Sequence, residues 1–311
     1  MGHDHAGHSH GLGANGTATG RHRKRLALVV AITLTGVVVQ LIGAAVSGSL
    51  SLLADAGHML SDAAGVSIAL FAAWIATRPA TSKRTFGWQR AEVLAALANA
   101  VALSVIAIVI FIEAVRRFGD APDIETPAML LAAVVGGVAN LACLLILHSG
   151  RKDSLNLRGA YLEVLGDLLG SAAVVAAGLV ILFTGQTIAD PIASMVIALM
   201  ILPRAWSLLR EVVDVLLEAT PRGVDLDEVR RHILEIDGVV DVHDLHAWTI
   251  TSGQPVCSAH VTLTADAFTP QRAHEVLDTL LECLGDHFDT EHSTFQLEPE
   301  GHARHEPASH D

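Results

Sequence analysis

Residues 50–77, LSLLADAGHMLSDAAGVSIALFAAWIAT, form a long apolar run that contains two acids and one histidine. A helix of about 20 apolar residues crosses the ~30 Å hydrocarbon core of a bilayer, so this run predicts a transmembrane helix. His58 and Asp62 are four residues apart, which places both side chains on one face of that helix. An ionisable side chain at membrane depth costs about 2.5–3.5 kcal/mol on insertion scales and by default indicates a functional site.

A second run, residues 159–183, repeats the pattern with Glu163 and Asp167. Two pairs on two helices supply four ligands, which is the number that tetrahedral zinc takes. Neither run contains a lysine or arginine that would pair with the carboxylates, which disfavours a buried salt network. A closed structural zinc site is one alternative. Ligands near the midplane of two helices, however, suit a transport site with alternating access. We expect Asp55 either to orient His58 or to face the outer mouth of the site.

Six apolar runs follow one another up to residue 217, in a chain of which 51% is hydrophobic and whose net charge is −13. They cover residues 26–46, 50–77, 93–112, 127–147, 159–183 and 188–203, and the last continues as a plausible helix through residue 217. Lysine and arginine cluster before the first run, between the second and third, and between the fourth and fifth. Because positive residues mark the cytoplasmic side, we expect a multi-pass protein of the cell (plasma or inner) membrane with both termini in the cytoplasm.

From about residue 218 the composition becomes that of a small soluble domain. The patterns predict helices at residues 225–235 and 270–284, and strands at residues 239–250, 256–263 and 293–297. This order favours two helices on one face of a three-stranded sheet. The predicted domains are a His-rich disordered cytosolic tail with a basic collar (1–25), a six-helix transmembrane domain (26–217), a cytosolic αββαβ domain (218–299) and a disordered tail (300–311).

Histidine also concentrates outside the predicted spans, in the N-terminal tail and on the predicted strands. The tail residues that would bind metal weakly are His3, His5, His8 and His10. The candidates for a cytosolic regulatory metal site are His243, Asp244, His246, His260 and His292. The tail also fits a solubilising segment, and the strand histidines also fit structural or solvated positions. If the tail captures metal, deletion of residues 2–20 should alter apparent affinity more than turnover.

Several motifs carry a family resemblance. They are LLADAGHMLSD at residues 52–62, YLEVLGD at 161–167 and VHDLHAW at 242–248, supported by TFGWQRAE at 85–92 and DPI at 190–192. Together they resemble the cation diffusion facilitator family over nearly the whole chain beyond residue 20. The resemblance implies an all-α bundle of six transmembrane helices followed by a cytosolic α+β domain of ferredoxin-like, metallochaperone-like fold.

The resemblance also implies a homodimer and the proton-coupled export of zinc or a related divalent ion. Family members bind regulatory zinc at the cytosolic domain, and His243 and His260 match positions used there. The family sometimes has a further metal site between the second and third spans. Residues 78–90 contain no Asp, His or Cys, so we predict that this site is absent.

Position 163 departs from the zinc-exporting pattern of the family, which has His-x-x-x-Asp in both helices. Glu163 in place of histidine takes the ligand set from about −2 to about −3, so a bound divalent ion leaves about −1. Either a proton stays on the site with the metal, or preference shifts toward ions such as Mn²⁺, Fe²⁺, Co²⁺ or Cd²⁺. We still favour Zn²⁺, because His58 is retained and glutamate is a known type of zinc ligand.

Two other classes of protein are weaker alternatives. An intramembrane metalloenzyme would need a general base or nucleophile beside an open metal position. The sequence has no H-E-x-x-H motif and no candidate nucleophile beside the pairs, so we expect no enzyme. A membrane metal sensor would bind the ion without moving it, so vectorial flux separates it from an exporter. The short basic loops are explained by topology, so we expect no nucleic-acid binding.

Overall fold

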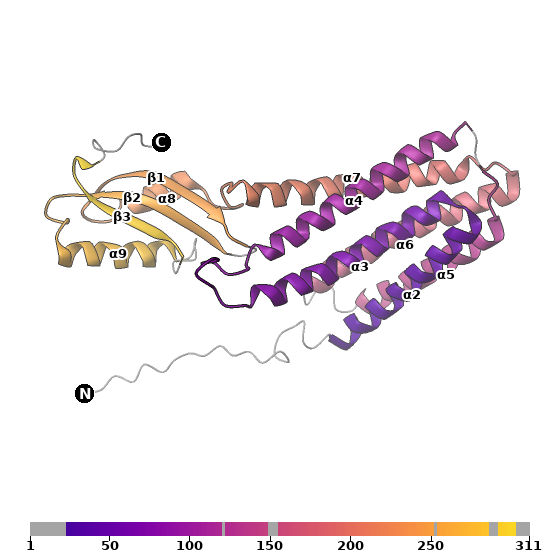
Figure 1. The fold of residues 1–311 in the computed structure, drawn as a ribbon, viewed down its shortest axis with the longest axis horizontal. Helices are drawn as coiled ribbons and strands as arrows, with labels where there is room; N and C mark the ends of the chain where they lie inside the picture. The colour runs from indigo at the N-terminus through magenta and orange to yellow at the C-terminus, as the bar shows by residue number, and fades with distance from the viewer. Residues whose placement is uncertain (1–22, 120–121, 149–154, 252–253, 286–291, 303–311) are drawn as a thin grey trace. The chain divides into compact units, whose positions relative to one another are not determined.

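The computed structural model describes residues 23–119, 122–148, 155–251, 254–285 and 292–302. Within these residues, six long helices come first (Figure 1): α2 (Arg23–Ser47), α3 (Leu50–Ala76), α4 (Ala91–Arg117), α5 (Thr126–His148), α6 (Leu155–Thr184) and α7 (Ala189–Leu216). Each of the six is long and apolar enough to cross a membrane. The elements that follow are α8 (Leu226–Leu234), β1 (Val239–Thr249), β2 (Pro255–Leu263), α9 (Pro270–Leu284) and β3 (Thr294–Pro299).

The chain forms two compact units. The described residues of Met1–Val66 and Asn99–Trp206 make up the first, and those of Ser67–Ala98 and Ser207–Asp311 make up the second. In the first unit, buried apolar side chains from all six long helices form a continuous cluster. Helix α5 packs against both α2 and α6. Small residues permit close approach of helices in a bilayer, and Gly43 of α2 lies directly against Ala132 of α5.

The start of α3 is capped by a carboxylate that belongs to α7. A helix leaves its first four N–H groups without acceptors inside the helix. Here the N–H of Leu50 donates to Asp190 Oδ2 at 2.8 Å, and the N–H of Ser51 donates to Asp190 Oδ1 at 3.1 Å. The hydroxyls of Ser49 and Ser51 also donate to Asp190 Oδ1, each at 2.6 Å. Since Asp190 is fully buried and a negative charge suits a helix N-terminus, these contacts fasten the beginning of α3 to α7.

The second unit contains a three-stranded sheet in the order β1-β2-β3, with β1 antiparallel and β3 parallel to β2. Helices α8 and α9 contact each other, and α8 also contacts β1. Buried side chains of both helices, among them Ile233 and Leu280, share one apolar core with the strands. The side chain of Asp225 accepts the N–H groups of Asp227 and Glu228 and so begins α8.

The predicted fold class is confirmed: six long apolar helices precede a small mixed sheet with two helices. The ends of elements differ from the prediction by a few residues. Strand β3 continues to Pro299, two residues beyond its predicted end, because its parallel pairing with β2 continues that far. This small difference matters for the second group of donor atoms described below.

Candidate functional site

Three ionisable side chains from α3 and α6 meet inside the first unit. His58 Nε2 lies 3.6 Å from Asp62 Oδ2 and 3.8 Å from Asp167 Oδ1. One donor atom from each of the three residues lies within 4.8 Å of the others. Ligand atoms at ~2.0–2.1 Å from a tetrahedral zinc ion are separated from one another by roughly 3.3–3.5 Å. The three donors are therefore close to the spacing that one metal ion requires.

These side chains are largely buried, and both carboxylate oxygens of the group lack a hydrogen-bond partner among the described residues. The side chains of His58, Asp62 and Asp167 are 12%, 13% and 5% exposed. Among the described residues, His58 Nδ1, Asp62 Oδ2 and Asp167 Oδ1 have no hydrogen-bond partner. Leaving a buried polar atom without a partner costs about 1–3 kcal/mol, so most such atoms in proteins are bonded. A divalent cation between the two carboxylate oxygens would satisfy both, so the donor set fits a metal ion chemically.

The fourth residue of the predicted set, Glu163, lies beside an arginine that also contacts Asp62. Arg204 of α7 places Nη2 3.3 Å from Glu163 Oε1 and Nη1 3.5 Å from Asp62 Oδ2. The group of three close donor atoms does not include Glu163.

Arg204 changes one premise of the sequence-based prediction. A salt network was disfavoured because neither run that bears the carboxylates contains a basic residue, yet a third helix supplies the guanidinium. The prediction misses the arginine because the sixth apolar run ends at Pro203, one residue before it, and only the helical continuation expected through residue 217 contains it. An arginine inside a membrane-length helix was the available signal.

Asp55 is buried and is held by polar side chains of α2 and α6. Its Oδ2 accepts hydrogen bonds from Gln40 Nε2 at 2.8 Å and from Ser171 Oγ at 2.9 Å. Asn140 Nδ2 donates to the same Ser171 Oγ at 3.4 Å. The carboxylate also packs directly on Gly170, where any Cβ would collide with it. These bonds tie α2, α3, α5 and α6 together, while the expected role of Asp55 in orienting the histidine stays a prediction.

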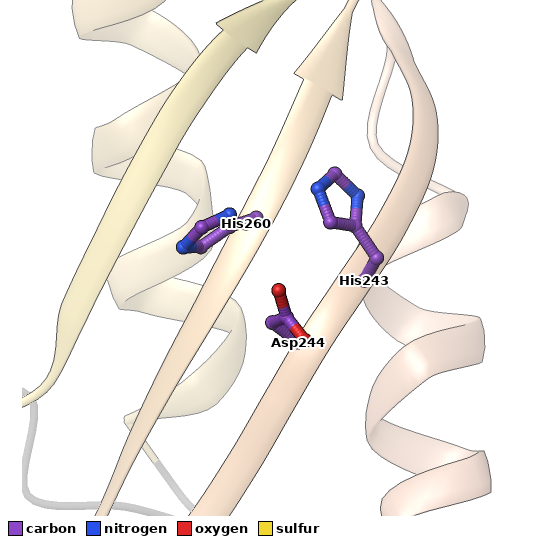
Figure 2. A group of neighbouring side chains, drawn as sticks. All are labelled: His243, Asp244 and His260. Atoms are coloured by element: carbon purple, nitrogen blue, oxygen red, sulfur yellow. The ribbon is translucent and has the colours of Figure 1, made fainter. Parts of the chain in front are cut away.

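A second group of donor atoms lies on the sheet of the second unit. Figure 2 shows His243 and Asp244 of β1 gathered with His260 of β2, and one donor atom of each lies within 4.8 Å of the others. His243 and His260 are directly paired across the two strands, and the register shifts just after His243. Asp244 lies in this bulge with φ of 47°, a left-handed conformation that Asp tolerates better than most residues. The bulge therefore brings the carboxylate beside the two rings.

Glu298 of β3 adds a carboxylate that the sequence-based prediction missed. Its Oε1 lies 3.0 Å from His260 Nδ1, and its Oε2 lies 3.5 Å from His243 Nε2. Its side chain is only 2% exposed. The predicted strand ended one residue before Glu298, so its pairing with β2 opposite Thr262 was not foreseen. An acid directly after the predicted strand, in a sheet whose other two strands carry histidines, was the available signal.

Other predicted residues lie apart from this group. His246 is exposed and pairs across the strands with Ser258. The ring of His292 lies 5.9 Å, centroid to centroid, from the ring of Phe86. Their role as ligands stays a prediction. The tail histidines at positions 3, 5, 8 and 10 lie outside the described residues.

The chain is similar to known transporters over almost its whole length. The family model for the cation efflux transmembrane domain matches residues 26–217, and the model for the cation efflux protein, cytoplasmic domain, matches residues 221–300. The metal cation efflux system protein CzcD of Cupriavidus metallidurans is 43% identical over 293 residues, which cover 94% of this chain and 90% of the relative. The zinc transporter ZitB of Escherichia coli is 41% identical over 294 residues, 94% of this chain and 92% of the relative.

A third relative has a name that specifies several ions. The cadmium, cobalt and zinc/H(+)-K(+) antiporter of Bacillus subtilis is 38% identical over 299 residues, 95% of this chain and 93% of the relative. All three relatives are cation efflux proteins and not enzymes. With two family models matched in sequence order on six apolar helices and a mixed sheet, the chain belongs to the cation efflux (cation diffusion facilitator) family of multi-pass membrane transporters.

Proposed function

We propose that the protein exports divalent cations from the cytoplasm in exchange for protons, with Zn²⁺ as the favoured substrate. The transport site consists of His58, Asp62, Glu163 and Asp167. The observation that carries the proposal is the buried group of three donor atoms, two of them carboxylate oxygens without a hydrogen-bond partner among the described residues. A site with one imidazole and several carboxylates suits zinc and similar ions.

Proton coupling follows from the chemistry of these ligands. Carboxylates and imidazole bind metal only when deprotonated, so metal binding releases protons and protons release metal. When the site faces the cytoplasm, it releases protons and binds the metal ion. When it faces outside, the higher proton concentration there protonates the ligands and releases the metal ion. The helices that bear the ligands then return in the protonated form. The antiporter name of the Bacillus subtilis relative supports this coupling.

We assign residues 26–217 to the membrane domain, residues 218–299 to a cytosolic domain, and the segments 1–25 and 300–311 to cytosolic tails. The basic clusters support cytoplasmic termini, because lysine and arginine gather on the cytoplasmic side of membranes. The protein would lie in the cell membrane as a homodimer joined through its cytosolic and transmembrane domains. The match of residues 221–300 to the family's cytoplasmic domain supports this arrangement.

We further propose that the cytosolic cluster binds a regulatory Zn²⁺ ion through His243, His260 and Asp244. Glu298 contributes either as a ligand or by orienting the two rings, since its oxygens lie 3.0 and 3.5 Å from their nitrogens. Carboxylates that hold metal-bound histidines in this way raise the affinity of a site.

Zinc flux into proteoliposomes tests the transport site. Under an imposed pH gradient, Asp62→Asn and Asp167→Asn should each lower Zn²⁺ flux to the level of empty liposomes, and Glu163→Gln should slow it. Flux that is indifferent to the pH gradient would rule out antiport. Wild-type flux in Glu163→Gln would remove Glu163 from the ligand set.

A preference for Mn²⁺, Fe²⁺, Co²⁺ or Cd²⁺ is the second candidate, and the three carboxylates around one imidazole favour it. Flux measured with a panel of metals distinguishes it from zinc export. A membrane metal sensor would bind the same ions in this assay and move none of them.

A further inference from the structure

We propose that Arg204 is a specificity-determining residue of the transport site: its fixed positive charge pairs with Glu163 and Asp62 and sets the net charge that an entering metal ion meets. This inference rests on the proposed function of His58, Asp62 and Asp167 as metal ligands.

Arg204 lies on the more exposed side of the site. Exposure falls from 50% at the Arg204 side chain to 33% at Glu163, 13% at Asp62 and 5% at Asp167. An ion that approaches the buried donors from this more exposed side therefore meets the guanidinium and Glu163 first. The arginine comes from α7, whereas the two carboxylates it contacts come from α3 and α6.

Arg204 also competes directly with the metal for one oxygen atom. Asp62 Oδ2 lies 3.6 Å from His58 Nε2 and 3.5 Å from Arg204 Nη1. A metal ion bound to that oxygen would carry two positive charges next to the guanidinium, and the two cations would repel each other. Metal binding therefore has to displace the guanidinium from Asp62. The guanidinium can keep its ion pair with Glu163 when this happens.

Charge balance explains why such a residue belongs beside Glu163. Three carboxylates and one guanidinium, with a neutral imidazole, leave a formal charge of about −2. A divalent ion then makes the site about neutral, which is the balance that two aspartates and two histidines would give. Arginine is suited to this task because its charge is permanent and its planar group can face two carboxylates at once.

The alternative is that Arg204 merely ties helices together. The ion pair with Glu163 is partly exposed, and such pairs contribute little to stability in general. If Arg204 only linked the helices, the planar geometry of its guanidinium would matter more than its charge. Lysine would then not replace Arg204. The two roles therefore predict opposite results for Arg204→Lys and for the double variant Glu163→Gln with Arg204→Gln.

The experiment measures the Zn²⁺ concentration for half-maximal flux (KM) and the maximal rate (kcat) in proteoliposomes of the full-length protein at one fixed pH. Arg204→Gln should lower KM by about tenfold or more and lower kcat, because the metal leaves a more negative site more slowly. Glu163→Gln should raise KM, because the positive guanidinium then lacks its carboxylate partner and the site becomes less negative. Glu163→Gln combined with Arg204→Gln should return KM close to wild type, and Arg204→Lys should stay within about threefold of it. Arg210→Gln, an exposed arginine further along α7, is the matched control and should leave both constants unchanged.

Two results would overturn the inference. One is an Arg204→Gln variant whose KM equals or exceeds that of wild type. The other is a double variant whose KM stays as high as that of Glu163→Gln alone. If either occurs while Asp62→Asn and Asp167→Asn abolish flux, only the role of Arg204 fails. If those two variants transport at the wild-type rate, the proposed function fails and takes this inference with it.

Discussion

The cap on α3 leads to a prediction about stability. Asp190→Ala removes the acceptor of two backbone N–H groups and two hydroxyls at the beginning of the helix that bears His58 and Asp62. The hydroxyls can turn to other acceptors, but the N–H groups of Leu50 and Ser51 are fixed in the helix. Two buried N–H groups without acceptors cost about 1–3 kcal/mol each. We therefore expect the free energy of unfolding to fall by roughly 3–5 kcal/mol, the middle of the range that these two costs span together.

A loss of this size is measurable as a change in apparent melting temperature. At about 2–4 °C per kcal/mol for a domain near this size, Asp190→Ala should melt roughly 6–20 °C below wild type in a matched detergent, followed by intrinsic tryptophan fluorescence. Ser194→Ala is the control, because its buried hydroxyl donates only to the backbone oxygen of Asp190 in its own helix. It should cost less than about 1 kcal/mol. A shift in Asp190→Ala no larger than that of the control would refute the cap as a main tie between α3 and α7.

Three further predictions concern the second unit. Burial raises the pKa of the Cys257 thiol to about 11. In the folded protein, alkylation of Cys257 by iodoacetamide should therefore be negligible at pH 8 and should rise only as the pH approaches 11. Rapid labelling of Cys257 at pH 8 would contradict this. Ile233→Ala should destabilise this unit by about 2–5 kcal/mol, because Ile233 is fully buried. The loss should be seen as faster hydrogen exchange in β1 and β2. Leu234 is the exposed neighbour, and the control Leu234→Ala should change the free energy of unfolding by less than about 0.5 kcal/mol. Glu298→Gln in an Asp62→Asn background should weaken the remaining Zn²⁺ binding by about tenfold or more, measured by equilibrium titration, and unchanged affinity would exclude Glu298 from the cytosolic site.

The helices and most of the strands could be predicted from the sequence because their signals are local. Each apolar run is long enough to span a membrane, and each strand of the soluble part alternates over a few residues. The pairing of His58 with Asp62 is also local, since four residues make one turn of a helix. That Asp167 lies near the same histidine could be expected from topology, because two antiparallel spans place their midpoints at similar depth.

Contacts between distant elements could not be predicted in this way. Arg204 meets Asp62 and Glu163 only because α7 packs beside α3 and α6, and no spacing in the sequence encodes that approach. Glu298 reaches two histidines only because β3 pairs in parallel with β2 at one particular register. Asp190 belongs to a recognisable motif, yet its role as the cap of α3 depends on a helix that begins 140 residues earlier in the chain.

The departure at position 163 and the arginine of α7 therefore have to be considered together. Taken alone, Glu163 gives a ligand set that is too negative for one divalent ion, and taken alone, Arg204 is an unexplained charge in a membrane helix. Placed 3.3 Å apart, each compensates the other. Under the proposed role of Arg204, changing Glu163 to histidine would not restore a zinc-exporting pattern, because the guanidinium would then face a set of only about −2 and leave it at about −1. The variant that reproduces the charge of two histidines and two aspartates must change Arg204 to a neutral residue as well.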